Sequence, residues 1–187
     1  MEKQKKQSES EALKETILSL IAYTKASRGE FEREPKCDEK GFEAIWEAMS
    51  ESQKEEVTRT FRKGMAVDCH AFLAWSLKGI IEALPEAKYG KQGKHEENEF
   101  KAFREMIKSM MGYVVIAEEA DEEKRQSHEE ALWDFVRYAF NDEMPDTLKG
   151  WVLDLFRNIY RLPFKYILDE ALLTIGDVYN ATAKNSD

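Results

Sequence analysis

The sequence contains few of the residues that cross-link a chain or interrupt its helices. Its 187 residues include only two cysteines, four prolines and nine glycines. The two cysteines, Cys37 and Cys69, do not make a disulfide framework, so we expect reduced thiols and a cytoplasmic protein. Because proline and glycine are the strongest helix breakers, their scarcity leaves room for long uninterrupted helices.

Long apolar runs are absent as well. No run approaches 18 apolar residues, so we expect no transmembrane helix and no membrane partner. The N-terminal stretch MEKQKKQSESEALKE has no apolar segment, so we expect no signal peptide. The chain is nevertheless 42% hydrophobic, and a chain of this length can bury one large core without metals or disulfides.

Acidic residues outnumber basic residues, and the excess is unevenly distributed. The formal net charge is -9 at pH 7. Residues 1–117 hold 20 Lys and Arg against 21 Asp and Glu, whereas residues 118–187 hold 8 against 16, a net of -8. Direct binding to nucleic acid is disfavoured, because phosphate backbones are bound by basic faces. The acidic C-terminal third is expected to attract a partner protein with a basic surface.

Apolar residues recur at helical spacing along most of the chain, and no segment alternates with period two. The sequence therefore predicts an all-α fold, a compact bundle of seven or eight helices without a sheet. We expect a disordered N-terminal tail at residues 1–9, one helical domain over 10–180 and a polar tail at 181–187. The central packing elements are expected at residues 65–84, 100–117 and 164–179.

Two of these segments carry especially regular patterns. Residues 164–179 carry a stripe of apolar residues at Phe164, Ile167, Leu168, Ala171, Leu172, Ile175 and Val178. Residues 100–117 have apolar residues spaced by three and four, at Phe100, Phe103, Ile107, Met110 and Val114. Such a seam fits either a core within the chain or a homodimer interface, so a homo-oligomer stays open. Gly112 lies inside this helix, which indicates a close helix contact or a bend.

Capping residues and helix breakers predict the helix boundaries. Ser8 or Ser10 can cap the first helix, and Ser50 or Ser52 can cap a later one. Asp146 or Thr147 is expected to cap the helix that precedes the last. A further helix is expected to begin at Ser127.

The prolines predict further boundaries. Pro85 is expected to end the helix over residues 65–84, because the residue before a proline avoids the helical conformation. Pro163 is expected in the first turn of the last helix, where the missing N–H costs nothing.

The histidines offer little support for catalysis or metal binding. None of His70, His95 and His128 belongs to a Glu-x-x-His or His-Glu-x-x-His motif. Asp68, Cys69 and His70 are contiguous on one predicted helix, where successive side chains point about 100° apart and cannot all reach one metal. We therefore expect Cys69 to be a core residue, and we predict no catalytic residue and no cofactor.

The carboxylates carry an alternative hypothesis. Glu118, Glu119 and Glu122 form a Glu-Glu-x-x-Glu pattern, which resembles the first half of the metal site in the all-α nucleotide pyrophosphohydrolases related to MazG. The resemblance implies a second motif, Glu-x-x-Asp, and carboxylates that hold Mg²⁺ on a substrate triphosphate. Glu143 and Asp146 have that spacing but flank a proline.

A second pair, Glu130 and Asp134, lies in a predicted helix but is spaced by four residues rather than three. The alternative function is thus a small metal-dependent nucleotide hydrolase. Its candidate Mg²⁺ ligands are Glu118, Glu119, Glu122, Asp134 and Asp146. The competing interpretation of the same carboxylates is a solvated helix end.

The absence of a complete catalytic constellation favours a non-enzymatic interaction protein, namely an adaptor, regulator or inhibitor. Its partner would have a basic surface, and a protein that handles nucleic acid is one such partner. Trp133 lies off the apolar stripe of its helix, and Tyr166 is expected to be partly exposed, as interface aromatics often are. The predicted interaction residues are Glu118, Glu119, Asp121, Glu122, Glu123, Glu129, Glu130, Trp133, Asp142 and Glu143.

Overall fold

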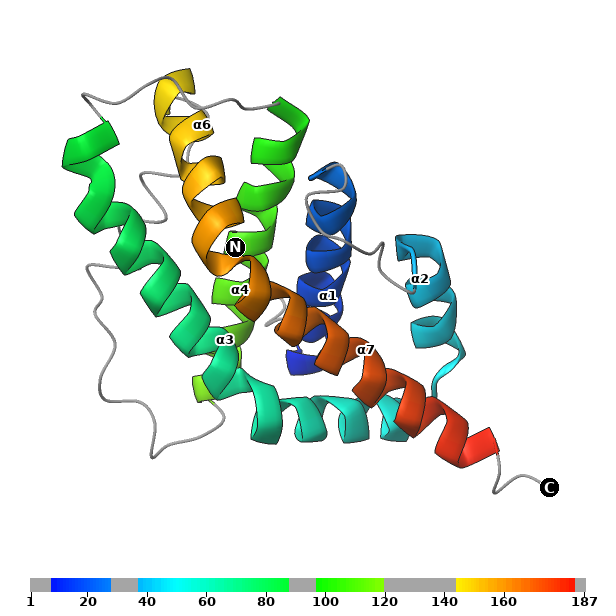
Figure 1. The fold of residues 1–187 in the computed structure, drawn as a ribbon. Helices are drawn as coiled ribbons and strands as arrows, with labels where there is room; N and C mark the ends of the chain where they lie inside the picture. Colours follow the sequence, from blue (N-terminus) through cyan, green and yellow to red (C-terminus); the bar gives the residue numbers. More distant parts are fainter. Residues whose placement is uncertain (1–7, 28–36, 88–96, 120–143, 184–187) are drawn as a thin grey trace, which may run out of the picture.

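A computed structural model of the chain describes residues 8–27, 37–87, 97–119 and 144–183 (Figure 1). These residues form six α-helices and one π-helical segment, and they contain no strand, which confirms the all-α prediction. No helix among them is long and apolar enough to cross a membrane.

Helix α1 (Glu9–Ala26) begins at a complete capping box. The Glu11 N–H donates to the Ser8 hydroxyl at 3.2 Å, and the Ser8 N–H donates to the Glu11 carboxylate at 3.1 Å. This reciprocal pair satisfies two backbone donors that a helix start otherwise leaves open. Of the two serines that the sequence offered as caps, Ser8 is therefore the N-cap.

Helices α1 and α4 (Glu97–Glu119) pack along each other at the centre of the fold. The regular seam of α4, from Phe100 to Val114, is buried within the chain, which decides between the two interpretations in favour of an internal core. The Thr16 hydroxyl lies between the two helices and contacts the carbonyl oxygens of Ala12 at 2.9 Å and Ser109 at 3.0 Å. A polar side chain is thus buried here with its hydrogen-bonding capacity used.

An aromatic cluster joins four helical segments in the core. The Phe156 ring centroid lies 4.9 Å from that of Phe103, 5.4 Å from that of Tyr23 and 5.8 Å from that of Phe72. All three pairs have the edge-to-face geometry that aromatic quadrupoles favour. The cluster therefore ties the π-helical segment η2 (Phe156–Tyr160) to α1, to α4 and to α3 (Glu51–Ala87).

Helix α3 (Glu51–Ala87) is one long element that joins the helix predicted to begin at Ser50 or Ser52 to the predicted segment at residues 65–84. Ser50 caps it, since the Gln53 N–H donates to the Ser50 hydroxyl at 3.3 Å. The helix continues through Gly64 and bends along its length (Figure 1). The expected end at Pro85 is wrong, because the helix runs to Ala87 with the proline in its final turn. A proline in the last turn removes the one hydrogen bond that its own N–H would make, and only two more residues of the helix follow it.

The C-terminal helices form one continuous path, seen in yellow, orange and red in Figure 1: α6 (Asp146–Leu155), the π-helical η2 (Phe156–Tyr160) and α7 (Arg161–Ala183). Pro163 lies in the first turn of α7, as expected. Because a proline cannot donate to the carbonyl four residues before it, the regular α-helical ladder is broken here, and the wider π turn carries the chain across that break.

One smaller expectation is wrong, and one alternative of another is excluded. The residue at the N-cap position of α6 is Pro145, and Asp146 is already the first helical residue, with no side-chain cap. Gly112 is exposed on α4, and a Cβ atom added there would have nothing within 4 Å, so this glycine does not serve a close helix contact. The helix expected from Ser127 lies outside the described residues.

Candidate functional site

The residues predicted to bind a partner lie almost entirely outside the described residues. Glu118 and Glu119 are the last two residues of α4, where only the backbone is described. The other eight lie within residues 120–143, namely Asp121, Glu122, Glu123, Glu129, Glu130, Trp133, Asp142 and Glu143. Their part in an interface stays a prediction.

One candidate ligand of the alternative Mg²⁺ site has a described side chain. The Asp146 side chain is 78% exposed, and its carboxylate lies 3.3 Å from the ammonium group of Lys149. That ammonium group competes with a metal ion for the same carboxylate. Glu122 and Asp134 lie outside the described residues, and no group of three or more His, Cys, Asp or Glu among the described residues could hold a metal ion.

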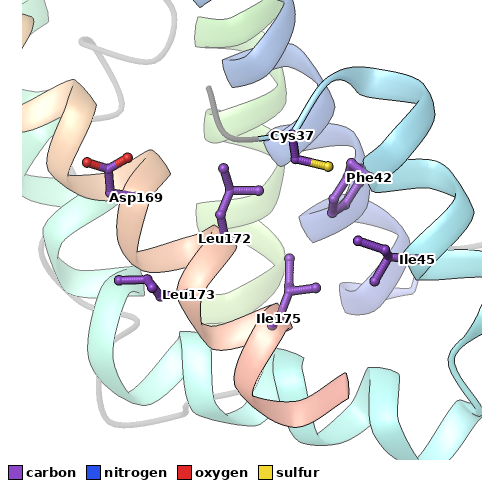
Figure 2. Close-up of a pocket in the computed structure, with 8 residues that line it drawn as sticks. Cys37, Phe42, Ile45, Asp169, Leu172, Leu173 and Ile175 are labelled. Carbon is purple, nitrogen blue, oxygen red and sulfur yellow. The ribbon is translucent and has the colours of Figure 1, made fainter. Parts of the chain in front are cut away.

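The structure instead reveals an apolar pocket between α2 (Glu39–Ala48) and α7 (Figure 2). Its volume is about 230 Å³. Phe42 and Ile175 are almost fully buried and form its floor, and Ile45 and Leu172 are half-buried. The lining residues are Cys37, Phe42, Ile45, Asp169, Leu172, Leu173, Ile175 and Gly176.

The start of α2 fixes one wall of this pocket. The Asp38 carboxylate caps the helix by accepting the Gly41 N–H at 2.7 Å. A Cβ atom at position 41 would lie 3.0 Å from the Cys37 sulfur, so the glycine allows the thiol to pack closely over the first turn. Figure 2 shows Cys37, Phe42 and Ile45 facing Leu172 and Ile175 across the pocket. This wall is therefore set by a local capping motif.

Two ion pairs hold α2 against α1. Lys14 lies 2.6 Å from Glu47, and Lys25 lies 2.9 Å from Glu39. Hydrogen bonding to Glu39 raises the pKa of Lys25, and hydrogen bonding to Lys14 lowers the pKa of Glu47. These pairs are largely exposed, and each contributes little stability. Together they hold α2, which forms one wall of the pocket, in position against α1.

The other wall of the pocket is α7, and a buried ion pair fixes the segment that leads into this helix. Arg157 in η2 donates from Nε to Glu99 of α4 at 3.0 Å and from a second nitrogen to the other carboxylate oxygen. It also donates to Asp154 at 2.9 Å. The two-pronged contact holds η2 against α4, and α7 follows η2 directly.

The outer surface of α7 combines apolar and acidic side chains. Residues spaced by three and four lie on one side of a helix, and here they are Tyr166, Asp169, Glu170, Leu173 and Asp177, which we call the α7 face. Tyr166 is 53% and Leu173 is 52% exposed, which confirms the expected exposure of Tyr166. Asp169 and Leu173 also line the pocket, so the pocket and the α7 face are continuous.

The net charge around the pocket is negative. Residues 166–183 contain three acidic residues and no Lys, Arg or His. Residues 38–48, which include α2 and its cap, contain four acidic residues and one lysine, so each segment has a net charge of -3. The pocket therefore opens between two negatively charged helices.

The pocket lining favours binding over catalysis. Desolvation raises the pKa of the Cys37 thiol, and the charge of Asp38 raises it further. The thiol is thus protonated at neutral pH and is a weak nucleophile. Among the described lining residues, Asp169 is the one that carries a charge. Such an arrangement can hold an apolar group beside a single carboxylate.

Sequence reasoning did not find this pocket. Leu172 and Ile175 belong to the predicted apolar stripe of the last helix, whereas Cys37 belongs to no predicted helix. Leu173 is a leucine outside that stripe, and its position was the available signal in the sequence.

The chain matches no protein-family model, no curated protein and no solved structure.

Proposed function

We propose that this chain is a non-enzymatic protein–protein interaction module that binds a partner with a basic surface. The observation that carries the proposal is the α7 face, where exposed Tyr166 and Leu173 lie among Asp169, Glu170 and Asp177. An exposed aromatic and an exposed leucine supply apolar contact area, and the surrounding carboxylates attract a cationic partner and orient it. The acidic residues predicted at 118–143 add further negative charge to the chain.

The charge distribution favours a protein as the partner rather than a nucleic acid. Residues 166–183 have a net charge of -3, so the face would repel phosphate and attract lysine and arginine. Complementary charge acts mainly on the rate of association and on the rejection of wrong partners. The apolar side chains would supply the buried core of the interface.

An affinity capture tests the proposal. The tagged full chain is used as bait in a nuclease-treated lysate of its source, and bound proteins are identified by mass spectrometry. We expect one stoichiometric partner with a basic surface, whose binding weakens as the salt concentration rises. Recovery of the bait alone would contradict the interaction function.

Charge reversal assigns the interaction to α7. The variant carries Asp169→Lys, Glu170→Lys and Asp177→Lys, and we expect it to bind the captured partner at least about tenfold more weakly. A matched control carries Glu55→Lys, Glu56→Lys and Glu105→Lys, which change the net charge equally on exposed positions of α3 and α4. Equal weakening by both variants would indicate a general charge effect and no role for this face.

A further inference from the structure

We infer that the pocket between α2 and α7 receives one apolar side chain of a basic partner segment, whose Lys or Arg contacts Asp169. The inference rests on the proposed function and adds the chemistry that the partner must present. It commits to a protein segment as the occupant, in preference to a small molecule or a second copy of the chain.

The size of the pocket favours a single side chain. Apolar cavities of about 150 Å³ hold a benzene molecule, whereas pockets for cofactors and drug-sized ligands span about 300–1,000 Å³. At about 230 Å³, this pocket lies between the two. A phenylalanine or leucine side chain fits that space, and the rest of the partner segment would lie over the adjoining α7 face.

The lining of the pocket favours an apolar anchor. Phe42 and Ile175 on the floor are 1% and 2% exposed, and Leu172 and Ile45 flank them. An inserted aliphatic or aromatic side chain would remove apolar surface from water on both partners without leaving a polar group unpaired. Anchors of this kind, seated in preformed pockets, provide most of the binding free energy in many interfaces.

Charge complementarity determines which residues of the partner segment can lie beside its apolar anchor. Asp169 and Leu173 lie on the side of the pocket that faces away from α2 (Figure 2). No cation is among the described residues that line the pocket, and both flanking helices have a net negative charge. A partner segment with Lys or Arg next to its anchor gains a charged contact with Asp169, whereas an acidic segment is repelled.

Gly176 provides a way to close the pocket without disturbing the fold. It lines the pocket, and a Cβ atom added there has nothing within 4 Å. Gly176→Leu therefore places a side chain in the pocket opening, and it removes a glycine that weakens the helix. Gly112→Leu is the matched control, because Gly112 is an exposed glycine of α4 with equally open surroundings and is not in the pocket lining.

The test uses a phage-displayed library of random 12-residue peptides, selected on the purified full chain. We expect enriched peptides to carry a Phe, Leu or Trp close to Lys or Arg. Their Kd, measured by fluorescence anisotropy, should rise at least tenfold for Gly176→Leu and should be unchanged for Gly112→Leu. Asp169→Asn should raise the Kd severalfold, and less at high salt, because screening already weakens that contact.

Other outcomes overturn the inference in distinguishable ways. Peptides could bind Gly176→Leu as tightly as the wild type and yet fail to bind the charge-reversal variant of α7. That result would rule out the pocket as the binding site and would still support the proposed function. No enrichment, or enrichment of acidic peptides, would count against both. A dimer seen by light scattering and dissociated by Gly176→Leu would make a second copy the occupant. Stabilisation by benzene without any peptide binding would make it a small apolar ligand.

Discussion

Arg157 and Glu99 form a bidentate ion pair that joins the π-helical turn to α4, and Glu99 is only 3% exposed. Desolvation opposes the charged form of Arg157, but hydrogen bonding to Glu99 and the charges around the guanidinium, chiefly that of Glu99, together raise its pKa above the usual value. The pair thus fixes the point where the C-terminal helices turn from α6 into α7. Since α7 carries the proposed interface, this contact sets the position of that interface relative to the core.

Removing the Glu99 carboxylate should destabilise the fold. Glu99→Ala leaves Arg157 without its buried partner, although Asp154 remains at 2.9 Å. Breaking a buried ion pair typically costs 3–5 kcal/mol, and the remaining partner should reduce this to about 2–3 kcal/mol in the free energy of unfolding. Urea denaturation followed by circular dichroism measures the change.

Glu97→Ala is the control for this substitution. The Glu97 side chain is 68% exposed and lies 3.6 Å from Lys149, so its loss should cost no more than about 1 kcal/mol. Equal costs for the two substitutions would show that the Arg157–Glu99 pair contributes nothing beyond a surface contact.

Tyr113→Phe should stabilise the protein. Tyr113 is fully buried, and its hydroxyl has no hydrogen-bond partner among the described residues. A buried polar group left without a partner costs about 1–3 kcal/mol, so removing the hydroxyl should raise the free energy of unfolding by about 1 kcal/mol. Thermal and urea denaturation at neutral pH measure the gain, and a loss of stability would show that the hydroxyl is hydrogen-bonded.

The same substitution should change the response to alkaline pH. Burial, followed by the charge of Glu9, raises the pKa of Tyr113 above its usual range. The unfolded chain releases this proton near pH 10 and the folded chain keeps it, so stability is complete below about pH 10 and falls above it, by up to about 1.4 kcal/mol per pH unit. Tyr113→Phe should flatten this slope, and Tyr166→Phe, at an exposed position, should leave it unchanged.

Ser8→Ala should weaken the start of α1. The substitution removes the hydroxyl that accepts the Glu11 N–H and should cost about 1 kcal/mol in the free energy of unfolding. Ser10→Ala should be close to neutral, because Ser10 lies within the helix, where alanine is the better helix former. Urea denaturation of the two variants under identical conditions measures both effects, and the opposite ranking would place the cap at Ser10.

The periodicity of the sequence predicted the helical class and the central place of residues 100–117, but not the central place of α1 beside them. Leu13, Ile17 and Leu20 recur at helical spacing, which suggests a helix with one buried side. The structure also buries Thr16 and Thr24 on α1, and each threonine hydroxyl donates to the carbonyl of the residue four positions before it. Because these hydroxyls are satisfied within their own helix, polar residues that looked like surface could enter the core beside α4.

The prolines and the pocket show two further limits of sequence reasoning. Proline rules describe the α-helical ladder, but a π turn before Pro163 lets the chain continue from α6 into α7. The pocket depends on Cys37 and Phe42 meeting Leu172 and Ile175, which are far apart along the chain. No local pattern encodes such a meeting, whereas the net charge of the C-terminal third was evident from composition alone.

Divalent cations provide the test between the interaction protein and the alternative hydrolase. A bound ion stabilises the folded state by about 2.7 kcal/mol when its concentration is 100 times the Kd. If Glu118, Glu119 and Glu122 do not form a metal site, about 10 mM MgCl₂ or MnCl₂ should leave Tm at the value found in NaCl of the same ionic strength. We expect this result because Asp146, the one candidate ligand with a described side chain, contacts Lys149. A rise in Tm that disappears in the variant Glu118→Gln, Glu119→Gln, Glu122→Gln would contradict it, and nucleotide triphosphates would then be the substrates to assay.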